Sequence, residues 1–286
     1  GEAHVDAAFG ELVVELADLV LSLGNRHPVA WHHDDSIRGS EELGHILQTA
    51  IEGLEADPHF NAGRGAVLQI DGVARLSASL MDGARQKFSG VALVTDVIHP
   101  SRLAYALQQK DQTVLGPLAA QSLARELGLP AESPVTPERL QQWHAYLAQA
   151  QAAHTPHGTV GVVVLDRHGH LAAATSTGGG SGNLPQRMSD SATVAGNYAS
   201  AFAAISCTGI GEQIVDDGVA VRIEPRVRDG YDILQACESA WQEACARQRQ
   251  YGWIGIDRQA RWAMMATTEV MPCGAMSAER ATPVIG

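Results

Sequence analysis

The chain has 286 residues, of which 45% are hydrophobic, enough to build the core of one large domain or two small ones. Its formal net charge of -12 disfavours nucleic acid and anionic membranes as partners, because both repel an acidic surface. No apolar run reaches the length of about eighteen residues that a membrane-spanning helix needs, and the first residues show no signal-peptide pattern.

The cysteine pattern bears on the compartment. Cys207, Cys237, Cys245 and Cys273 show no CxxC spacing, so they predict neither a zinc site nor a disulfide framework. Unpaired cysteines are typical of proteins that stay in a reducing environment. We therefore expect a cytoplasmic protein.

Two helices with an irregular stretch between them are expected at the start. Residues 7–24 place apolar side chains at helical spacing, which predicts an amphipathic helix. Residues 27–39 are irregular, and the H-H-D-D run within them favours a solvated loop over a metal site, because adjacent side chains point in different directions. Ser40 is expected to cap the next helix, and Asp57-Pro58 to end it.

Turns and short strands are expected next. The sequence F-N-A-G-R-G at 60–65 contains two glycines that permit a tight turn into a strand over residues 66–70. Asp71-Gly72 is a hairpin signal, which predicts a returning strand over residues 73–80. After the turn M-D-G, residues 91–94 form another predicted strand.

The middle of the chain is predicted to be helical. Residues 101–129 favour one or two helices, and residues 138–151 a third, on the other side of a Pro-rich break. Residues 152–158 are polar and indicate a loose linker.

A hairpin follows this linker. Residues 159–166 are apolar and β-branched, as in a strand buried on both faces, and residues 171–177 return after a polar turn. Because the two ends of an antiparallel hairpin lie side by side, Thr159 and Thr177 are expected to face each other.

The last third mixes strands with one helix. It predicts a short strand over 204–207, a sharp turn over 208–211, a helix over 231–247, and a hairpin of 252–256 with 263–267. Helices flanking antiparallel strands predict an α+β fold in which two sheets form a sandwich covered by helices.

Four motifs follow one another in register. They are H-G-T-V-G from 157, A-T-S-T-G-G from 174, L-P-Q-R-M-S-D-S from 184 and S-C-T-G-I-G-E from 206. In this order and spacing they resemble the plant-type asparaginase and isoaspartyl peptidase family of N-terminal nucleophile hydrolases. F-N-A-G-x-G and M-D-G match the same family, and the resemblance runs from about residue 41 to about residue 276.

The resemblance implies a fold and a processing event. The family's fold is a four-layer αββα sandwich, here one domain over residues 1–286. The family cuts its own chain ahead of the nucleophile, which places the cut between Gly158 and Thr159 and yields an α subunit, 1–158, and a β subunit, 159–286. The resemblance also implies a homodimer of such αβ units.

The residue types explain why a cut would be needed. A threonine hydroxyl is a poor nucleophile without an adjacent base. Cleavage before Thr159 frees an α-amino group with an unperturbed pKa of about 7.7–8.0, which can accept the proton of the hydroxyl on the same residue. Thr177 is placed to hydrogen-bond the nucleophile, and the Thr208 hydroxyl with the Gly209 N–H suits an oxyanion hole, as the family uses them.

Specificity is assigned to two charges. Arg187 can bind a carboxylate through its planar fork, and Asp190 can pair with an ammonium group. Together they would hold the α-carboxylate and α-amino group of one amino acid and present its β-acyl carbon to Thr159. With the residues that the resemblance adds, the predicted substrate-binding set is Asn61, Arg187, Asp190, Thr208, Gly209 and Gly211.

The resemblance also implies a structural sodium ion and no catalytic cofactor. In the family, backbone carbonyls of the loop that precedes and includes F-N-A-G wrap the ion. The corresponding residues here are Leu54, Glu55, Asp57, Phe60, Ala62 and Arg64. A glycine-rich turn without an ion is the alternative for this loop.

The function expected is a self-processing threonine amidohydrolase acting on β-aspartyl peptides and L-asparagine. Two alternatives stay open: a glycosylasparaginase, and an inactive relative that acts as a binding protein. A phosphate loop at the three glycines 178–180 is excluded because no Lys-Ser/Thr follows. No H-G-G-A-G segment occurs near the start, which predicts that one central strand is missing or replaced, and Ile210 stands where the family has a hydroxyl.

Overall fold

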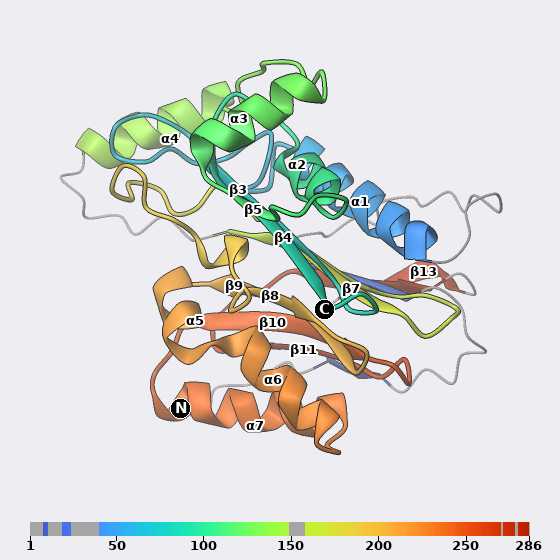
Figure 1. Ribbon diagram of the computed structural model, residues 1–286. Helices are drawn as coiled ribbons and strands as arrows, with labels where there is room; N and C mark the ends of the chain where they lie inside the picture. The colour runs from blue at the N-terminus through green and yellow to red at the C-terminus, as the bar shows by residue number, and fades with distance from the viewer. Residues whose placement is uncertain are drawn as a thin grey trace.

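Two β-sheets packed face to face form the centre of the molecule (Figure 1). The computed structural model describes residues 8–10, 19–23, 40–148, 158–269, 271–277 and 280–285. Within these residues, one sheet has five strands in the order β1 (Ala8–Gly10), β11 (Trp262–Ala266), β10 (Tyr251–Asp257), β9 (Ala203–Gly209), β8 (Asn197–Ala199). The other has eight in the order β13 (Arg280–Ile285), β12 (Cys273–Ser277), β2 (Leu19–Leu23), β6 (Val160–Leu165), β7 (Leu171–Thr177), β3 (Leu76–Asp82), β4 (Lys87–Val94), β5 (Val114–Leu115).

Helices cover the outer faces of both sheets. In Figure 1, helices α1 (Ser40–Ala56), α2 (Pro100–Leu107) and α3 (Pro117–Glu126) lie over the eight-stranded sheet. On the opposite side, α5 (Gly211–Asp217), α6 (Val219–Arg228) and α7 (Ile233–Ala246) lie along the five-stranded sheet. The predicted α+β sandwich with αββα layers is therefore confirmed.

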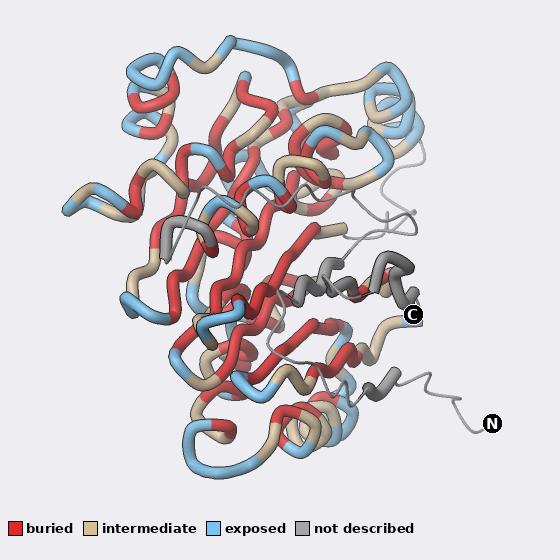
Figure 2. The backbone as a smooth tube through the Cα atoms, turned by 90° about the vertical axis from the view of Figure 1, so that its right-hand side faces the viewer, coloured by how far each residue is buried: buried red, intermediate tan, exposed pale blue. Residues whose placement is uncertain are grey.

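Strand β6 shows why its sequence is apolar throughout. Val160, Val162 and Val164 pack with α1 on the outer face, whereas Val163 and Leu165 pack against the five-stranded sheet. Successive side chains of a strand point to opposite faces, so a strand covered on both sides needs apolar residues at every position. Figure 2 shows the same arrangement, with buried strands inside and exposed residues on the outer helices and loops.

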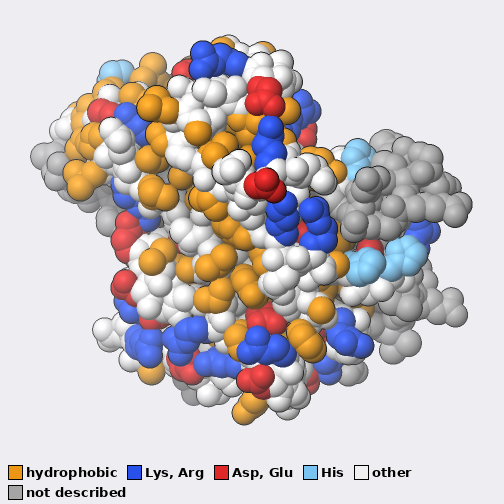
Figure 3. Space-filling model, in the orientation of Figure 1, with side chains coloured by type: hydrophobic (Ala, Val, Ile, Leu, Met, Phe, Trp, Pro, Cys, Tyr) orange, Lys and Arg blue, Asp and Glu red, His pale blue; other side chains and the backbone are white. Residues whose placement is uncertain are grey.

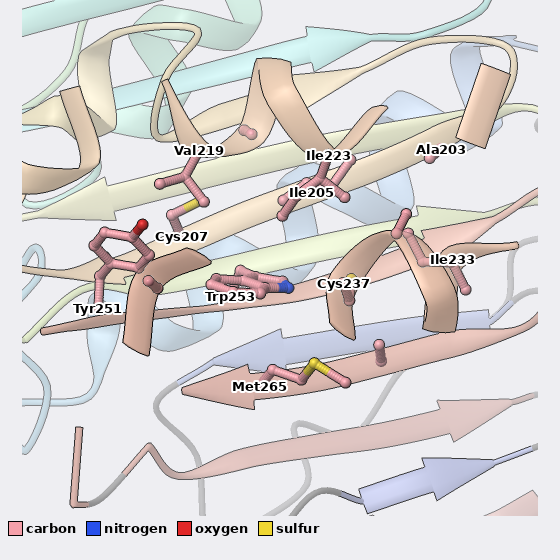
Figure 4. Close-up of a cluster of buried hydrophobic side chains, with 14 of the residues drawn as sticks. Ala203, Ile205, Cys207, Val219, Ile223, Ile233, Cys237, Tyr251, Trp253 and Met265 are labelled. Carbon is pink, nitrogen blue, oxygen red and sulfur yellow. The ribbon is translucent and has the colours of Figure 1, made fainter. Parts of the chain in front are cut away.

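A second apolar core lies beneath α6 and α7. Trp253 of β10 is fully buried there, between residues of the neighbouring strands and the two helices (Figure 4). Cys207 and Cys237 belong to this core, and burial raises the pKa of the Cys237 thiol to about 12. These two thiols are therefore packing residues and stay protonated at neutral pH.

The predicted helix over residues 7–24 is wrong where the structure describes this segment. Ala8–Gly10 forms β1, and Leu19–Leu23 forms β2, which pairs antiparallel with β12 on one side and β6 on the other. The apolar residues of this stretch fit a doubly covered strand as well as a helix, and pairing with two neighbours decides between them. Because β2 lies inside the sheet, no strand is missing at this place, and a segment without the H-G-G-A-G motif fills it.

Other boundaries differ from the predictions in both directions. Residues 66–69 belong to no strand, although the turn at Gly72 and the return into β3 are present. Helices α5 and α6 and strands β12 and β13 were not predicted, because their short apolar runs carry no clear period. Helix α4 (Pro137–Ala148) confirms the third helical segment through residue 148. The H-H-D-D run, the linker over 149–157 and residues 24–39 lie outside the described residues.

Charges of both signs adjoin one another on the face shown in Figure 3. The described residues hold ion pairs such as Arg226–Glu243 at 2.6 Å and Lys110–Glu126 at 3.0 Å. None of the helices within the described ranges is long and apolar enough to cross a membrane.

Candidate active site

The hairpin of β6 and β7 brings two hydroxyls together. Val160 pairs with Ser176 in the antiparallel register, so the residues just beyond this pair, Thr159 and Thr177, come to the same end of the hairpin. The Thr159 Oγ1 donates to the Thr177 Oγ1 at 3.3 Å. Thr177 is 1% exposed, whereas Thr159 is only half-buried. The predicted juxtaposition of Thr159 and Thr177 is confirmed.

The carbonyl that precedes Thr159 is held by two donors. The Thr177 Oγ1 donates to the Gly158 oxygen at 2.8 Å, and the Asn61 Nδ2 donates to the same oxygen at 2.9 Å. The Gly179 N–H donates to the Thr177 Oγ1 at 3.0 Å, which helps to orient that hydroxyl. A continuous chain of hydrogen bonds therefore leads from the Thr159 hydroxyl, through Thr177, to the carbonyl of its own preceding residue.

Asn61 owes its position to a tight loop. Its Oδ1 accepts from the Val67 N–H at 2.9 Å, and its backbone oxygen accepts from the Gly178 N–H at 2.9 Å. The loop closes because Gly63 adopts a φ of +49°, and a Cβ there would lie 2.3 Å from the Glu55 backbone oxygen. The amide is thus fixed at both ends before any ligand arrives.

The Thr208–Gly209 segment ends β9, rather than forming a turn outside it. Gly209 has a φ of +129°, and a Cβ there would lie 2.5 Å from the Tyr251 Cα of the neighbouring strand. Across the two sheets, the Thr175 and Ser206 hydroxyls are 2.6 Å apart. Since residues two apart share a face of a strand, Thr177 and Thr208 lie on the two facing sides of the sandwich.

Arg187 pairs with an acid that the sequence analysis did not single out. Its Nε and Nη2 donate to the two carboxylate oxygens of Glu212 at 2.7 and 2.6 Å. The predicted handle gives Arg187 and Asp190 separate contacts with the substrate, and no hydrogen bond joins these two side chains among the described contacts. The signal for Glu212 was its position directly after T-G-I-G, where α5 begins.

Asp190 is buried, whereas its predicted role in holding the substrate leads us to expect a side chain in a solvent-reached pocket. The residue is 4% exposed, and burial raises the pKa of its carboxyl to about 6. Its Oδ1 accepts from the Ser189 hydroxyl at 3.1 Å. No hydrogen-bond donor reaches its Oδ2 within the part of the chain that the structure describes. A buried acceptor without a donor is costly, so this atom is suited to receive one from a ligand.

Two glycines lie close to the charged side chains of Arg187 and Asp190. A Cβ on Gly211 would lie 2.5 Å from the Arg187 Nη2 and 2.6 Å from the Asp190 Oδ1. A Cβ on Gly179 would lie 4.0 Å from the Arg187 Nη1. The end of β7, the end of β9 and both predicted handle residues therefore meet in one region, as the site prediction requires.

In the loop proposed for sodium, two backbone oxygens lie close to Gly65. A Cβ on Gly65 would lie 2.3 Å from the Pro58 oxygen and 2.8 Å from the Phe60 oxygen. The Asp57 and Glu55 oxygens of the predicted set accept N–H bonds from Phe60 and Arg64, at 3.2 and 2.7 Å. Within the described ranges, no group of three or more His, Cys, Asp or Glu side chains is arranged to hold a metal.

Comparison with known proteins agrees with this geometry. A profile of the asparaginase family matches residues 36–285, which is most of the chain. The chain belongs to the asparaginase family. The resemblance drawn from four short motifs is therefore confirmed.

Individual members of the asparaginase family are similar over most of their length. The chain is 41% identical to the isoaspartyl peptidase/L-asparaginase of Synechocystis sp., covering 80% of this chain and 74% of that protein. It is 37% identical to the isoaspartyl peptidase of Salmonella typhimurium, with 79% and 78% covered. It is 36% identical to the plant-type L-asparaginase of Pyrobaculum calidifontis, with 79% and 80% covered.

Proposed function

We propose that the protein is a self-processing threonine amidohydrolase that cleaves β-aspartyl peptides and L-asparagine through a β-aspartyl acyl-enzyme. The observation that carries this proposal is the hydrogen-bond chain from Thr159 through Thr177 to the Gly158 carbonyl. It joins a nucleophile to the bond that must break for the nucleophile's amino group to become free. The names of the similar proteins from Synechocystis and Salmonella support the substrate class.

The first reaction is the cut itself. The Thr159 oxygen attacks the Gly158 carbonyl carbon, and negative charge develops on the Gly158 oxygen in the transition state. The hydroxyl proton is relayed through the Thr177 hydroxyl and ends on the Thr159 nitrogen as the C–N bond breaks. Thr177 and Asn61 already donate to that oxygen, at 2.8 and 2.9 Å, so its charge is stabilised without rearrangement. The Gly158–Thr159 amide becomes an ester, and water then hydrolyses the ester to leave a free carboxylate on Gly158 and a free amine on Thr159.

The second reaction is turnover of substrate. The neutral Thr159 amine takes the hydroxyl proton, and the oxygen attacks the β-carbonyl carbon of the substrate. The Thr208 hydroxyl and Gly209 N–H, which end β9 on the facing side of the sandwich, serve as donors to the oxyanion. The leaving amine departs with a proton, and water hydrolyses the acyl-enzyme to release aspartate and regenerate Thr159.

The charged end of the site selects the substrate. Asp190 offers its Oδ2, which has no donor among the described residues, to the α-ammonium group, and Arg187 offers its guanidinium to the α-carboxylate. Glu212 holds the fork of Arg187 in the structure, so a substrate carboxylate would share or displace that contact. An α-linked aspartyl peptide has its carboxylate in the amide and cannot make this pair of contacts.

The proposal is tested by a denaturing gel followed by an assay. The purified protein should give two pieces, 1–158 and 159–286, and should release a free amino acid from β-aspartyl dipeptides while sparing α-aspartyl dipeptides. A chain that stays whole through long incubation and turns over neither substrate would mean an inactive relative instead.

Three further parts of the proposal concern assembly and environment. We propose a structural sodium ion held by the carbonyls predicted for the loop at 54–64, supported by the Phe60 oxygen that lies close to Gly65 within this tight loop. We also propose a homodimer of αβ units. We also propose a reducing compartment such as the cytoplasm, because the spacing of the four cysteines predicts no disulfide framework.

A further inference from the structure

A buried carboxylate lies behind the active-site hairpin. Glu55, near the end of α1, is 0% exposed, and the reaction described above does not use it. A buried charge is tolerated only where hydrogen bonds replace water. The contacts that satisfy Glu55 reveal what it connects.

Both oxygens of this carboxylate are occupied. The Ser176 hydroxyl donates to Oε1 at 2.6 Å, and the Ser101 N–H donates to the same oxygen at 3.2 Å. The Ser101 hydroxyl donates to Oε2 at 2.7 Å, and the His99 Nδ1 lies 3.3 Å from it. Glu55 therefore ties β7 to the first turn of α2.

The Ser176 contact reaches the site from the opposite face of the strand. Ser176 lies between Thr175 and Thr177, and side chains alternate along a strand. Thr175 reaches Ser206 of the other sheet, whereas Ser176 reaches Glu55 on the helix side. The carboxylate thus holds β7 one residue before the hydroxyl that touches Thr159.

The backbone of Glu55 holds the loop that carries Asn61. Its carbonyl oxygen accepts from the Arg64 N–H at 2.7 Å, and it is the atom that a side chain at Gly63 would strike. This bond closes the loop that carries Asn61. One residue is thereby bonded to both segments whose side chains, Asn61 and Thr177, meet at the Gly158 carbonyl.

From this arrangement we propose that Glu55, acting through Ser176, is a positioning residue that sets Thr177 against Asn61 for the attack on Gly158. Glu55 itself contacts none of the reacting atoms. The inference rests on the proposed function only in naming the reaction that this positioning affects. Without the Ser176 bond, the end of β7 still pairs with β6 and β3 but loses its hydrogen bond to α1. A displacement of about 1 Å between reacting groups can slow a reaction about a hundredfold.

The test compares two buried serines. Ser176→Ala removes only the bond to Glu55. Ser89→Ala is its control, because Ser89 is also 0% exposed and lies in the same sheet on β4. Its hydroxyl donates to the Ala104 oxygen at 2.6 Å and accepts from the Gln108 Nε2 at 2.8 Å, both away from the site. Freshly synthesised protein is followed over time on a denaturing gel, and the melting temperature of each variant is measured alongside.

We expect the two variants to melt at similar temperatures but to differ in self-cleavage. Ser176→Ala should cut about ten- to a hundredfold more slowly than Ser89→Ala, which should cut at the wild-type rate. Equal cleavage rates in the two variants would overturn the positioning role. If both cut at the wild-type rate, the Ser176 bond does not matter for cleavage, and if both are slow, loss of stability explains both.

A second measurement does not depend on cleavage. In a Thr159→Ala background, hydrogen exchange is followed at residues 176–180, where the Gly178 N–H bonds Asn61 and the Gly179 N–H bonds Thr177. Faster exchange with Ser176→Ala than with Ser89→Ala supports the inference, even if the wild-type chain never cuts and the proposed function fails. Unchanged exchange overturns the inference, whatever the wild-type chain does.

Discussion

The two ends of the active site are built on opposite principles. At the nucleophile end, Asn61, Thr177 and Gly158 are neutral groups, and each has its hydrogen-bond partners in place. At the other end, Arg187 and Asp190 carry charge, and the Asp190 Oδ2 is buried with no donor among the described residues. The first end is complete without a ligand, whereas the second is not.

This difference matches the order of the two proposed reactions. The cut at Gly158–Thr159 is intramolecular and needs only preorganised neutral donors. Substrate turnover needs an ammonium and a carboxylate from outside, which supply the missing partners of the charged end. Changes at the two ends should therefore separate self-cleavage from turnover.

The largest effect is expected at the nucleophile. Thr159→Ala removes the hydroxyl proposed to attack Gly158, so the chain should stay intact and show no turnover. A denaturing gel and an assay with a β-aspartyl dipeptide measure the two losses. If Thr159→Ala still yielded pieces 1–158 and 159–286, another protease would be responsible for the cut.

Arg187→Ala should affect the second reaction alone. We expect normal self-cleavage and a fall in kcat/KM of about ten- to a hundredfold, because a hydrogen bond to a charged group contributes about 1.5–3 kcal/mol. Arg187→Lys should recover only part of the activity, since an ammonium lacks the planar fork. Loss of cleavage in Arg187→Ala would show that the two ends of the site are not independent.

The pH dependence of binding should report Asp190. Burial raises the pKa of this carboxyl to about 6, so below that pH it is protonated in the free enzyme and cannot pair with an ammonium group. The inhibition constant of L-aspartate, the expected product, should rise about tenfold per pH unit below 6. In Asp190→Asn, binding should be weak and should not change over the same range.

The smallest effect is on stability. An aspartate whose folded pKa exceeds its unfolded value stabilises the fold below about pH 4 and loses that contribution as pH rises through about 6. Asp190→Asn removes the penalty of the buried charge, so it should raise the free energy of unfolding at pH 7 by about 1–3 kcal/mol and change little at pH 3.5.

Asp217 provides a control of opposite sign for this measurement. Burial alone would raise the pKa of its carboxyl, but bonds from Arg249, Tyr251 and Arg247 outweigh burial and lower it. Asp217→Asn should therefore lose stability at pH 7, measured by urea unfolding. A gain in both variants would show that removal of negative charge in general, and not burial at Asp190, stabilises this acidic protein.

The hairpin was predictable from sequence because both of its strands are buried on two faces and so leave a continuous apolar signal. Thr159 and Thr177 followed from antiparallel geometry alone. Asn61, by contrast, came only from family resemblance, since a loop 98 residues earlier in the chain carries no local sign of where it docks.

The strand β2, the burial of Asp190 and the partner of Arg187 could not be predicted, because they depend on contacts between residues far apart in the sequence. Leu19–Leu23 reads as part of a helix until β6 and β12 are present to pair with it. The burial of Asp190 arises where Gly196 and Gly211 pack against its carboxylate, and neither glycine is adjacent to it in sequence. Arg187 took Glu212 as its partner because α5 begins beside it, and that helix had no predictable period.

The strand order of the larger sheet has a consequence for the cut protein. β2, β3, β4 and β5 come from the piece before Thr159, whereas β6, β7, β12 and β13 come from the piece after it, and the two sets alternate across the sheet. The pieces cannot part without dismantling the sheet, so cleavage leaves one interlocked body. Once such a body unfolds, however, it becomes two molecules, and recovery depends on their concentration. The proposed cut would thus make refolding depend on the concentration of two pieces, and the lifetime of the folded protein would be set by how slowly the first strand pair opens.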